Sequence, residues 1–201
     1  LLAGRLVAFP TETVYGLGAD AVSPEAVARI YAAKGRPSNH PVIVHVAPGA
    51  DLSYWAKNIP DEAHALIRAF WPGPLTLILE RADHIPAQVS GGQTTIGLRC
   101  PAHPVARQLL EVFSALKNGN GGVAAPSANK FGQVSPTQAS HVREEFADLD
   151  EADLLVLEGG SSEVGIESTI LDLSRLESVG PVLLRPGHIS ATDIAGVLGV
   201  M

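Results

Sequence analysis

The chain has 201 residues, 46% of them hydrophobic and 17% charged, with one cysteine and a formal net charge of −7. This composition excludes a disordered chain and indicates one globular domain whose core is stable without disulfides, in a reducing, cytoplasmic setting. The acidic balance argues against a protein whose whole surface binds nucleic acid but allows a local basic cleft. No apolar run reaches the roughly 18 residues that span a bilayer, and we expect no membrane association.

Segments with strand-like and helix-like patterns alternate from the first residues onward. Residues 1–4 resemble the end of a helix with its C-terminal glycine, so we expect the start of the chain to be trimmed. Strands are predicted where short apolar runs occur, at residues 6–9, 41–47, 75–79, 95–99, 123–125, 154–157, 169–173 and 182–184.

Helices are predicted from their capping residues and apolar faces. Ser23, Pro24 and Glu25 form a typical helix start, and Gly35 ends that helix. Further helices are expected at residues 61–70, at residues 104–116, from a capping box at residues 135–138 to near residue 146, and after a capping serine at position 190. About seven strands and five or six helices, not strictly alternating, predict an α+β fold (α/β in three layers), with a twisted mixed sheet flanked by helices.

The most informative segment is residues 9–18, where a short strand runs into Pro10 and then into four polar side chains and two glycines. It shows no apolar period, and we expect a loop that presents polar groups beside a rigid strand rather than a core element. Three other segments share this character, at residues 34–37, 125–130 and 165–169. Because loops of this kind usually carry binding and catalytic groups, these four segments form the candidate site.

Lys34 and Arg36 lie where a helix is predicted to end, and both side chains only donate hydrogen bonds. An isolated pair of this kind is usually a solvated helix end that interacts with the helix dipole. Gly35 and Pro37 stiffen the segment here, which favours phosphate binding, since a guanidinium group can hold two phosphate oxygens. Arg185, which ends a strand before a Pro-Gly pair, is another cation held by a rigid element.

Ser127 and Asn129 follow a predicted strand end, and in an extended chain side chains two residues apart face the same way. A hydroxyl and an amide would then face one pocket, with Lys130 beside them, although an ordinary Asn/Ser turn is the more frequent meaning of such a pattern. Ser135 is interpreted as a helix cap, and a helix N-terminus is also a ready anion site.

The remaining polar residues narrow the class of site. His45 lies in an otherwise apolar strand and is interpreted as structural; no Cys, Asp or Glu cluster accompanies it, and no metal site is expected. Cys100 is interpreted as a small buried hydrophobe. The sequence has no P-loop and no Rossmann fingerprint. Cations, hydroxyls and an amide without a covalent nucleophile suit an anion-rich small molecule and phosphoryl or nucleotidyl transfer.

Seven stretches give the chain a more specific resemblance. They are FPTETVYGLGADA from residue 9, KGRP and HPVIVHV between residues 34 and 46, WPGPLTLIL from residue 71, IGLRCPAHPVA from residue 96, APSANKFGQVSPT from residue 125, GIESTILDL from residue 165 and LLRPG from residue 183. In this order, and over nearly the whole chain, they resemble the YrdC-type threonylcarbamoyl-AMP synthase family, also called L-threonylcarbamoyladenylate synthases.

The resemblance implies a YrdC-like fold and a nucleotidyltransferase. Such an enzyme makes threonylcarbamoyl-AMP and pyrophosphate from L-threonine, bicarbonate and ATP with Mg2+, toward N6-threonylcarbamoylation of adenosine 37 in tRNA. The resemblance implies threonine contacts from Thr13, His45, Arg99 and Ser168, which raises His45 to a ligand candidate. It implies ATP contacts from Lys34, Arg36, Thr95, Ser127, Asn129, Ser135 and Arg185, with Lys34 and Arg36 as the catalytic cations.

The resemblance also implies partners and boundaries. A threonylcarbamoyl transferase complex would receive the adenylate, while contact with tRNA stays open. Residues 1–201 would form a single catalytic domain, either a short form of the family or a cut long form without its second C-terminal domain.

Two alternatives remain. One is a paralogue of the same fold that binds RNA or acts in ribosome maturation, and the other is a carbamoyl-adenylate domain like that of hydrogenase-maturation carbamoyltransferases. The acidic charge and the intact cation sets weigh against the first, and the single cysteine weighs against the second.

Overall fold

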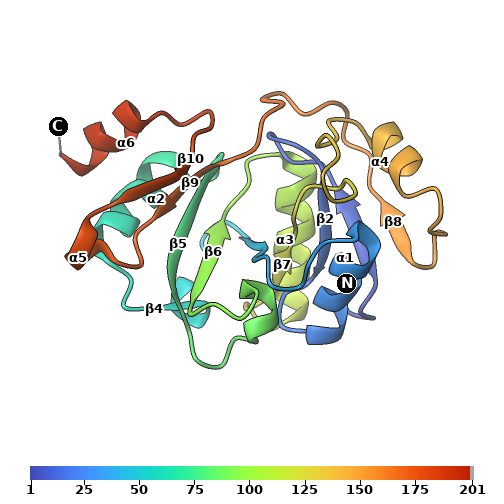
Figure 1. Ribbon diagram of the computed structural model, residues 1–201, viewed down its shortest axis with the longest axis horizontal. Helices are drawn as coiled ribbons and strands as arrows, with labels where there is room; N and C mark the ends of the chain where they lie inside the picture. Colours follow the sequence, from blue (N-terminus) through green and yellow to red (C-terminus); the bar gives the residue numbers. More distant parts are fainter. Residues whose placement is uncertain (200–201) are drawn as a thin grey trace.

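The strands of the computed structural model form one twisted mixed sheet (Figure 1). The structure describes residues 1–199, so the last two residues of the predicted domain lie outside the described residues. The strand order is β10-β9-β5-β6-β3-β7-β2-β1-β8, with β4 paired to β5. The strands are β1 (Leu6–Phe9), β2 (Gly16–Asp20), β3 (Ile43–Val46), β4 (Ala56–Lys57), β5 (Leu75–Arg81), β6 (Thr95–Arg99), β7 (Gly122–Ala124), β8 (Leu154–Val156), β9 (Thr169–Asp172) and β10 (Val182–Arg185).

Parallel and antiparallel pairs alternate irregularly in this sheet. The pairs β3–β6, β5–β9 and β1–β8 are parallel, and the other pairs are antiparallel. The predicted mixed sheet flanked by helices is therefore confirmed, although the described residues form ten strands where about seven were predicted.

Helices pack on both faces of the sheet. They are α1 (Pro24–Lys34), α2 (Asp61–Phe70), α3 (Pro104–Leu116), α4 (Ala139–Glu145), α5 (Leu176–Val179) and α6 (Ala191–Leu198), with two short 3-10 turns at Leu52–Tyr54 and Ala87–Ser90. Within residues 1–199, no helix combines the length and the apolar character that crossing a membrane requires.

The core is divided between the two faces of the sheet. The larger cluster includes Val44, Leu77 and Leu98 on one face, and it contains the apolar sides of α1, α2, α4 and α6. The smaller cluster joins Phe9 and Val123 on the opposite face to α3. Because α3 contacts β7 and β3 in particular, the second face stays uncovered by this helix toward β5 and β9.

Helix α1 is built as its sequence predicts. The Ser23 hydroxyl accepts a hydrogen bond from the Ala26 amide at 3.2 Å, and Gly35 ends the helix in the left-handed conformation, with φ of 62°. The predicted cap of α6 is also present, because Ser190 and Asp193 form a reciprocal capping box. The rigid end of α1 fixes the backbone from which Lys34 and Arg36 project.

The capping box predicted at residues 135–138 is wrong. Helix α4 begins at Ala139, after Gln138, whose side chain makes no cap hydrogen bond. The Ser135 hydroxyl instead donates to Glu167 Oε1 at 2.8 Å. The reason is tertiary, because the Pro136 carbonyl accepts from the Tyr15 amide at 2.8 Å and holds this segment away from the helix.

The expectation that residues 9–18 are not a core element is also wrong. Every residue of this segment is buried, and its last three residues, from Gly16 to Gly18, belong to strand β2. A Gly-Leu-Gly-Ala-Asp sequence has weak strand propensity, which is why the strand was missed. At Gly18 a Cβ would lie 2.7 Å from Val123 Cγ1 and 2.8 Å from Phe9 Cε1, so close packing against neighbouring strands requires a glycine.

Candidate active site

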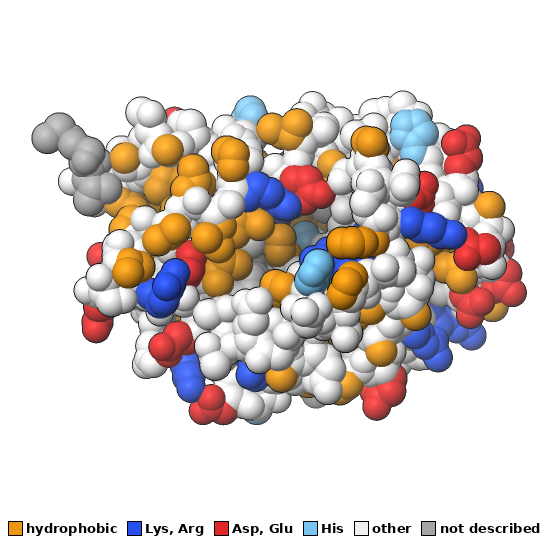
Figure 2. Space-filling model, viewed as in Figure 1, with side chains coloured by type: hydrophobic (Ala, Val, Ile, Leu, Met, Phe, Trp, Pro, Cys, Tyr) orange, Lys and Arg blue, Asp and Glu red, His pale blue; other side chains and the backbone are white. Residues whose placement is uncertain are grey.

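A cavity of about 380 Å³ lies on the sheet face opposite the larger core cluster. Its floor includes Ile43, Gly97 and Ile78, which pair side by side on β3, β6 and β5. Figure 2 shows a hollow near the middle of the visible face, with hydrophobic side chains on one side and charged side chains along its edge. The polar and charged residues that line the cavity are Arg36, Gln93, Thr95, Ser127, Glu167, Asp172 and Arg185.

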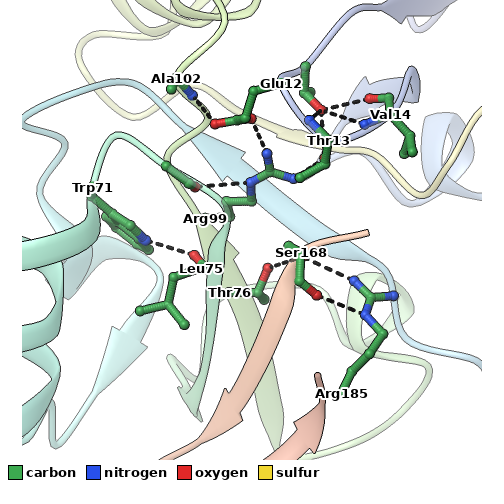
Figure 3. Close-up of polar contacts among 12 residues, drawn as sticks. Glu12, Thr13, Val14, Trp71, Leu75, Thr76, Arg99, Ala102, Ser168 and Arg185 are labelled. Atoms are coloured by element: carbon green, nitrogen blue, oxygen red, sulfur yellow. Dashed lines mark hydrogen bonds and ion pairs between the residues drawn. The ribbon is translucent and has the colours of Figure 1, made fainter. Parts of the chain in front are cut away.

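Arg99 ends β6 two residues beyond Gly97, on the same face of the sheet, and only 4% of the residue is exposed. Its guanidinium group pairs with Glu12, donates to Thr13 Oγ1 at 2.9 Å and donates to the Gly73 carbonyl at 3.2 Å (Figure 3). Glu12 accepts a second hydrogen bond from the Ala102 amide at 2.7 Å. Burial lowers the pKa of Arg99 and Glu12 opposes that shift, so a buried positive charge is held in one orientation beside the Thr13 hydroxyl.

His45 lies opposite Arg99 in the β3–β6 register and is fully buried at the side of the Phe9 ring, with ring centroids 6.0 Å apart. Burial, reinforced by the Arg99 charge, lowers the pKa of His45 to about 3, so its imidazole is neutral. Among the described residues, its Nδ1 has no hydrogen-bond partner. A buried nitrogen without a partner is uncommon in a purely structural histidine, and a ligand would satisfy it.

Ser168 lies directly before β9, and its hydrogen bonds reach Thr76 on β5 and Arg185 at the end of β10. Its hydroxyl lies 2.8 Å from Thr76 Oγ1 on β5 and accepts from Arg185 Nη2 at 3.0 Å, while its carbonyl accepts from Arg185 Nε at 2.9 Å. Figure 3 shows Ser168 between Arg99 on one side and Arg185 on the other. The structure therefore places two candidate groups, one assigned to threonine and one to ATP, in direct contact.

Glu167 lines the cavity and connects two segments of the chain. It accepts from Ser135 Oγ at 2.8 Å and from Arg185 Nη1 at 2.6 Å. Ser135 belongs to the segment after β7, whereas Arg185 ends β10, so this carboxylate bridges elements from opposite halves of the sheet.

Lys34 is the last residue of α1, and its ammonium group is buried. It donates to the carbonyls of Ser127 and Asn129, which leaves one of its three protons for another partner. Burial lowers the pKa of Lys34 to about 8, and the neighbouring Arg36 charge adds to this effect. The amine therefore changes charge close to neutral pH.

Arg36 lies on the segment that follows α1 and lines the cavity. Its Nη2 donates to the Pro41 carbonyl at 2.9 Å, and its buried Nε has no partner among the described residues. Burial lowers its pKa, but an arginine stays protonated at any physiological pH. Thr95, at the start of β6, also lines the cavity, 3.5 Å from the Gln93 side chain.

The predicted Ser127–Asn129–Lys130 pocket forms only in part. Ser127 lines the cavity, but the Asn129 amide donates to the Lys130 and Gln133 carbonyls of its own loop, at 2.9 and 2.8 Å. Lys130 pairs with Asp148 at the surface. The reason is local, because the backbone amide of Asn129 donates to the Ser127 carbonyl and turns the chain. Cys100 is buried, and burial raises its thiol pKa to about 11, as expected of a small hydrophobe.

Sequence reasoning missed three residues of this network: Glu12, Thr76 and Glu167. The first and third lay within segments already singled out, but nothing in the sequence shows which cation each carboxylate contacts. Thr76 had a usable signal, because it is the one polar residue in the apolar run Leu-Thr-Leu-Ile-Leu of β5. A fully buried hydroxyl in such a strand needs a hydrogen-bond partner, and Ser168 is that partner.

The arrangement has two chemically distinct ends. One end combines the fixed charge of Arg99 with the Thr13 and Ser168 hydroxyls and a neutral imidazole, which suits a small molecule that carries both a carboxylate and donor groups. The other end brings Arg36 and Arg185 to one cavity, with the Lys34 ammonium behind Ser127, which suits a polyphosphate.

Comparison with known proteins gives consistent likenesses. The Sua5/YciO/YrdC family model, described as telomere recombination, matches residues 1–187. The chain is 46% identical to the threonylcarbamoyl-AMP synthase of Pyrococcus abyssi, over 98% of this chain and 54% of that protein. It is 45% identical to the threonylcarbamoyl-AMP synthase of Bacillus subtilis, over 97% of this chain and 53% of that protein.

The structural likeness is equally extensive. The structure of P. abyssi Sua5 complexed with L-threonine matches with a TM-score of 0.88 at 44% identity, covering 99% of this chain and 55% of that chain. The chain thus spans about half the length of these relatives.

Proposed function

The chain belongs to the Sua5/YciO/YrdC family, and on that premise we propose that its site synthesises threonylcarbamoyl-AMP. The substrates are L-threonine, bicarbonate and ATP with Mg2+, and the second product is pyrophosphate. The adenylate serves N6-threonylcarbamoylation of adenosine 37 in tRNA. This proposal takes the activity named for the curated relatives and assigns it to the residues of this chain.

The observation that carries the proposal is the fixed position of Arg99 beside the cavity. A buried arginine whose orientation is set by Glu12 is suited to a substrate carboxylate, because bidentate pairing needs a preorganised guanidinium group. Thr13, His45 and Ser168 surround this group, and we assign all four residues to L-threonine. The neutral His45 can accept a hydrogen bond from the threonine amine.

The nucleotide is assigned to the other end of the site. We assign the triphosphate to Lys34, Arg36 and Arg185, with contributions from Thr95, Ser127 and Ser135. Asn129 supports the same end by fixing the loop whose carbonyls hold Lys34. Lys34 and Arg36 are the proposed catalytic cations, since they carry charge toward the reacting phosphate.

The proposed reaction has two bond-forming steps. Bicarbonate takes up a proton and loses water to give carbon dioxide. The threonine nitrogen bonds to that carbon and releases a proton, which yields a carbamate and balances the proton that bicarbonate consumed. A carbamate oxygen then attacks the α-phosphorus in line, and the bond from that phosphorus to the β-phosphate oxygen breaks. Pyrophosphate leaves, and Lys34, Arg36 and Arg185 offset the negative charge that develops. A Mg2+ ion bound to the phosphates would supply further charge compensation. Positioning and charge compensation supply the catalysis, because no covalent nucleophile takes part.

The proposal extends to organisation and partners. We propose that residues 1–201 act as one catalytic domain in the cytoplasm, and that a threonylcarbamoyl transferase complex consumes the labile adenylate. Direct contact with tRNA is a separate proposal that the same assay can examine by adding tRNA.

Pyrophosphate release measures the reaction directly. We expect release only when ATP, L-threonine and bicarbonate are all present, with a threonylcarbamoyl adduct of AMP identified by mass. Lys34→Ala and Arg36→Ala should each slow release by roughly 100-fold, as expected when charge stabilisation of a transition state is removed. Lys57→Ala, which removes a surface cation paired with Asp83, is the matched control and should leave the rate unchanged. Full release by both active-site variants contradicts the assignment.

A further inference from the structure

Two carboxylates accompany the arginines of the site, and they are held very differently. Glu12, beside Arg99, is almost fully buried and is also held by the Ala102 amide. Glu167, beside Arg185, has 36% of its side chain exposed. Among the described residues, its hydrogen bonds go only to side chains, those of Arg185 and Ser135. Glu12 is thus a fixed counter-ion, whereas Glu167 can change partners without breaking any backbone contact.

Both partners of Glu167 are groups assigned above to the nucleotide. Arg185 has all three of its guanidinium nitrogens engaged, one by Glu167 and two by Ser168. The Ser135 hydroxyl is engaged by the same carboxylate. A phosphate oxygen that approaches Arg185 and Ser135 from the cavity therefore meets groups that already hold an anion.

Glu167 also lies within the field of the other cations. It raises the pKa values of Lys34, Arg36 and Arg99, although burial of each group has the larger, opposite effect. It lines the cavity together with Arg36 and Arg185. The carboxylate therefore neutralises part of the charge that would otherwise attract a polyphosphate.

We propose that Glu167 occupies the position of a substrate phosphate and competes with the polyphosphate for Arg185 and Ser135. This inference rests on the proposed function and deepens it. On binding, Glu167 exchanges both partners for the phosphate oxygens and turns toward solvent. On release, it takes them back, which weakens the hold on pyrophosphate and helps this highly charged product to leave.

Two other roles for Glu167 predict the opposite sign. If the carboxylate only braces the segments that carry Ser135 and Arg185, its loss weakens anion binding. If it helps to hold a divalent cation that accompanies the phosphates, its loss weakens binding only when that cation is present. Competition predicts tighter binding after the negative charge is removed, and it predicts this without any metal.

The test is calorimetric titration with inorganic pyrophosphate in the presence of EDTA. Glu167→Gln keeps the size of the side chain and removes its charge, and we expect the dissociation constant of pyrophosphate to fall by about threefold to tenfold. Glu163→Gln is the matched control, because it makes the same charge change at an exposed position of the same loop. It should change the dissociation constant by less than about twofold, because solvent and salt screen an exposed charge. Equal or weaker binding by Glu167→Gln overturns the proposal.

A double variant locates the effect. In an Arg185→Ala background, removal of the Glu167 charge should no longer tighten pyrophosphate binding, because the contested group is absent. A full gain in that background means that Glu167 acts through general repulsion and contradicts competition for Arg185.

The binding measurement is also separate from the proposed reaction. Tighter pyrophosphate binding by Glu167→Gln without threonine-dependent pyrophosphate release would support the competition and reject the synthase. Threonine-dependent release without tighter binding would support the synthase and reject the competition. Absence of binding by every variant would reject both.

Discussion

Arg99 and Glu12 carry opposite charges in a part of the protein from which water is almost completely excluded. Removing both charges from water is costly, and their attraction repays that cost only because the geometry is well satisfied. Glu12 meets this condition through the Ala102 amide, and Arg99 through Thr13 and the Gly73 carbonyl. The pair therefore orients the site rather than adding net stability.

Loss of Glu12 should be far more damaging than loss of a surface glutamate. Glu12→Ala leaves the Arg99 charge buried without its partner, and the free energy of unfolding should fall by about 3 kcal/mol or more. Glu111→Ala, on the exposed side of α3, is the control and should change it by less than about 0.5 kcal/mol. Urea denaturation measures both. A Glu12 variant as stable as the control would mean that the pair does not form.

Lys34 should make nucleotide binding depend on pH. Its pKa of about 8 means that the free protein loses this charge as the pH rises through 8, and the charged groups that face it are Arg36, Glu145 and Glu167. The proposed contact of Lys34 with the triphosphate requires the charged form, so the affinity for ATP should fall by about eightfold between pH 7.5 and pH 9. Lys34→Arg keeps its charge throughout this range and should remove the dependence. Titration calorimetry at each pH measures it, and a flat wild-type profile would contradict the assignment of Lys34.

The kinds of residue in the site could be predicted from sequence, but their partners could not. Lysine, arginine and serine beside glycine and proline indicated anion binding because those groups donate hydrogen bonds from stiff segments. Glu12 and Arg99 are 87 positions apart, and Ser135 and Glu167 are 32 positions apart. No local pattern encodes such pairs. The same limit explains Ser135, whose sequence fits a helix cap but whose hydroxyl serves a distant carboxylate.

At the scale of elements, local signals succeeded where capping residues and apolar runs agreed. The bounds predicted for β6 and α3 match the structure, and Ser23 and Gly35 mark the two ends of α1. Strand β2 was not predicted, because its glycines have low strand propensity and are present for close packing. Phe9 and Val123 on the neighbouring strands leave no room for a side chain at Gly18. The sequence of β2 alone does not contain that information.

Two glycine substitutions should have opposite effects on stability. Gly18→Ala forces a methyl group against Val123 and Phe9 and should lower the free energy of unfolding by about 1 to 3 kcal/mol. Gly196→Ala lies within α6 with open space around the added methyl group and should raise it by about 1 kcal/mol, because alanine favours the helix. Thermal and urea unfolding of the two variants give the comparison. A neutral Gly18→Ala would mean that β2 is not packed as described.

At the scale of the whole molecule, the site exists because the two faces of the sheet are covered unequally. Four helices contribute to the core on one face, whereas α3 packs over only part of the other, and the cavity lies on the remainder. The mixed fold class could be predicted from irregular alternation of strands and helices. The strand order could not be predicted, because β5 pairs with β9 and many other elements lie between these two strands in the sequence.

The proposed reaction requires that the carbon of bicarbonate joins threonine to AMP in this site. Incubation with ATP, L-threonine and bicarbonate labelled with carbon-13, followed by mass analysis of the adenylate, tests that claim most directly. We expect a threonylcarbamoyl adduct of AMP that is about one mass unit heavier than the unlabelled product, formed together with pyrophosphate. An adduct of threonine and AMP without the label, or pyrophosphate release that ignores bicarbonate, would contradict it.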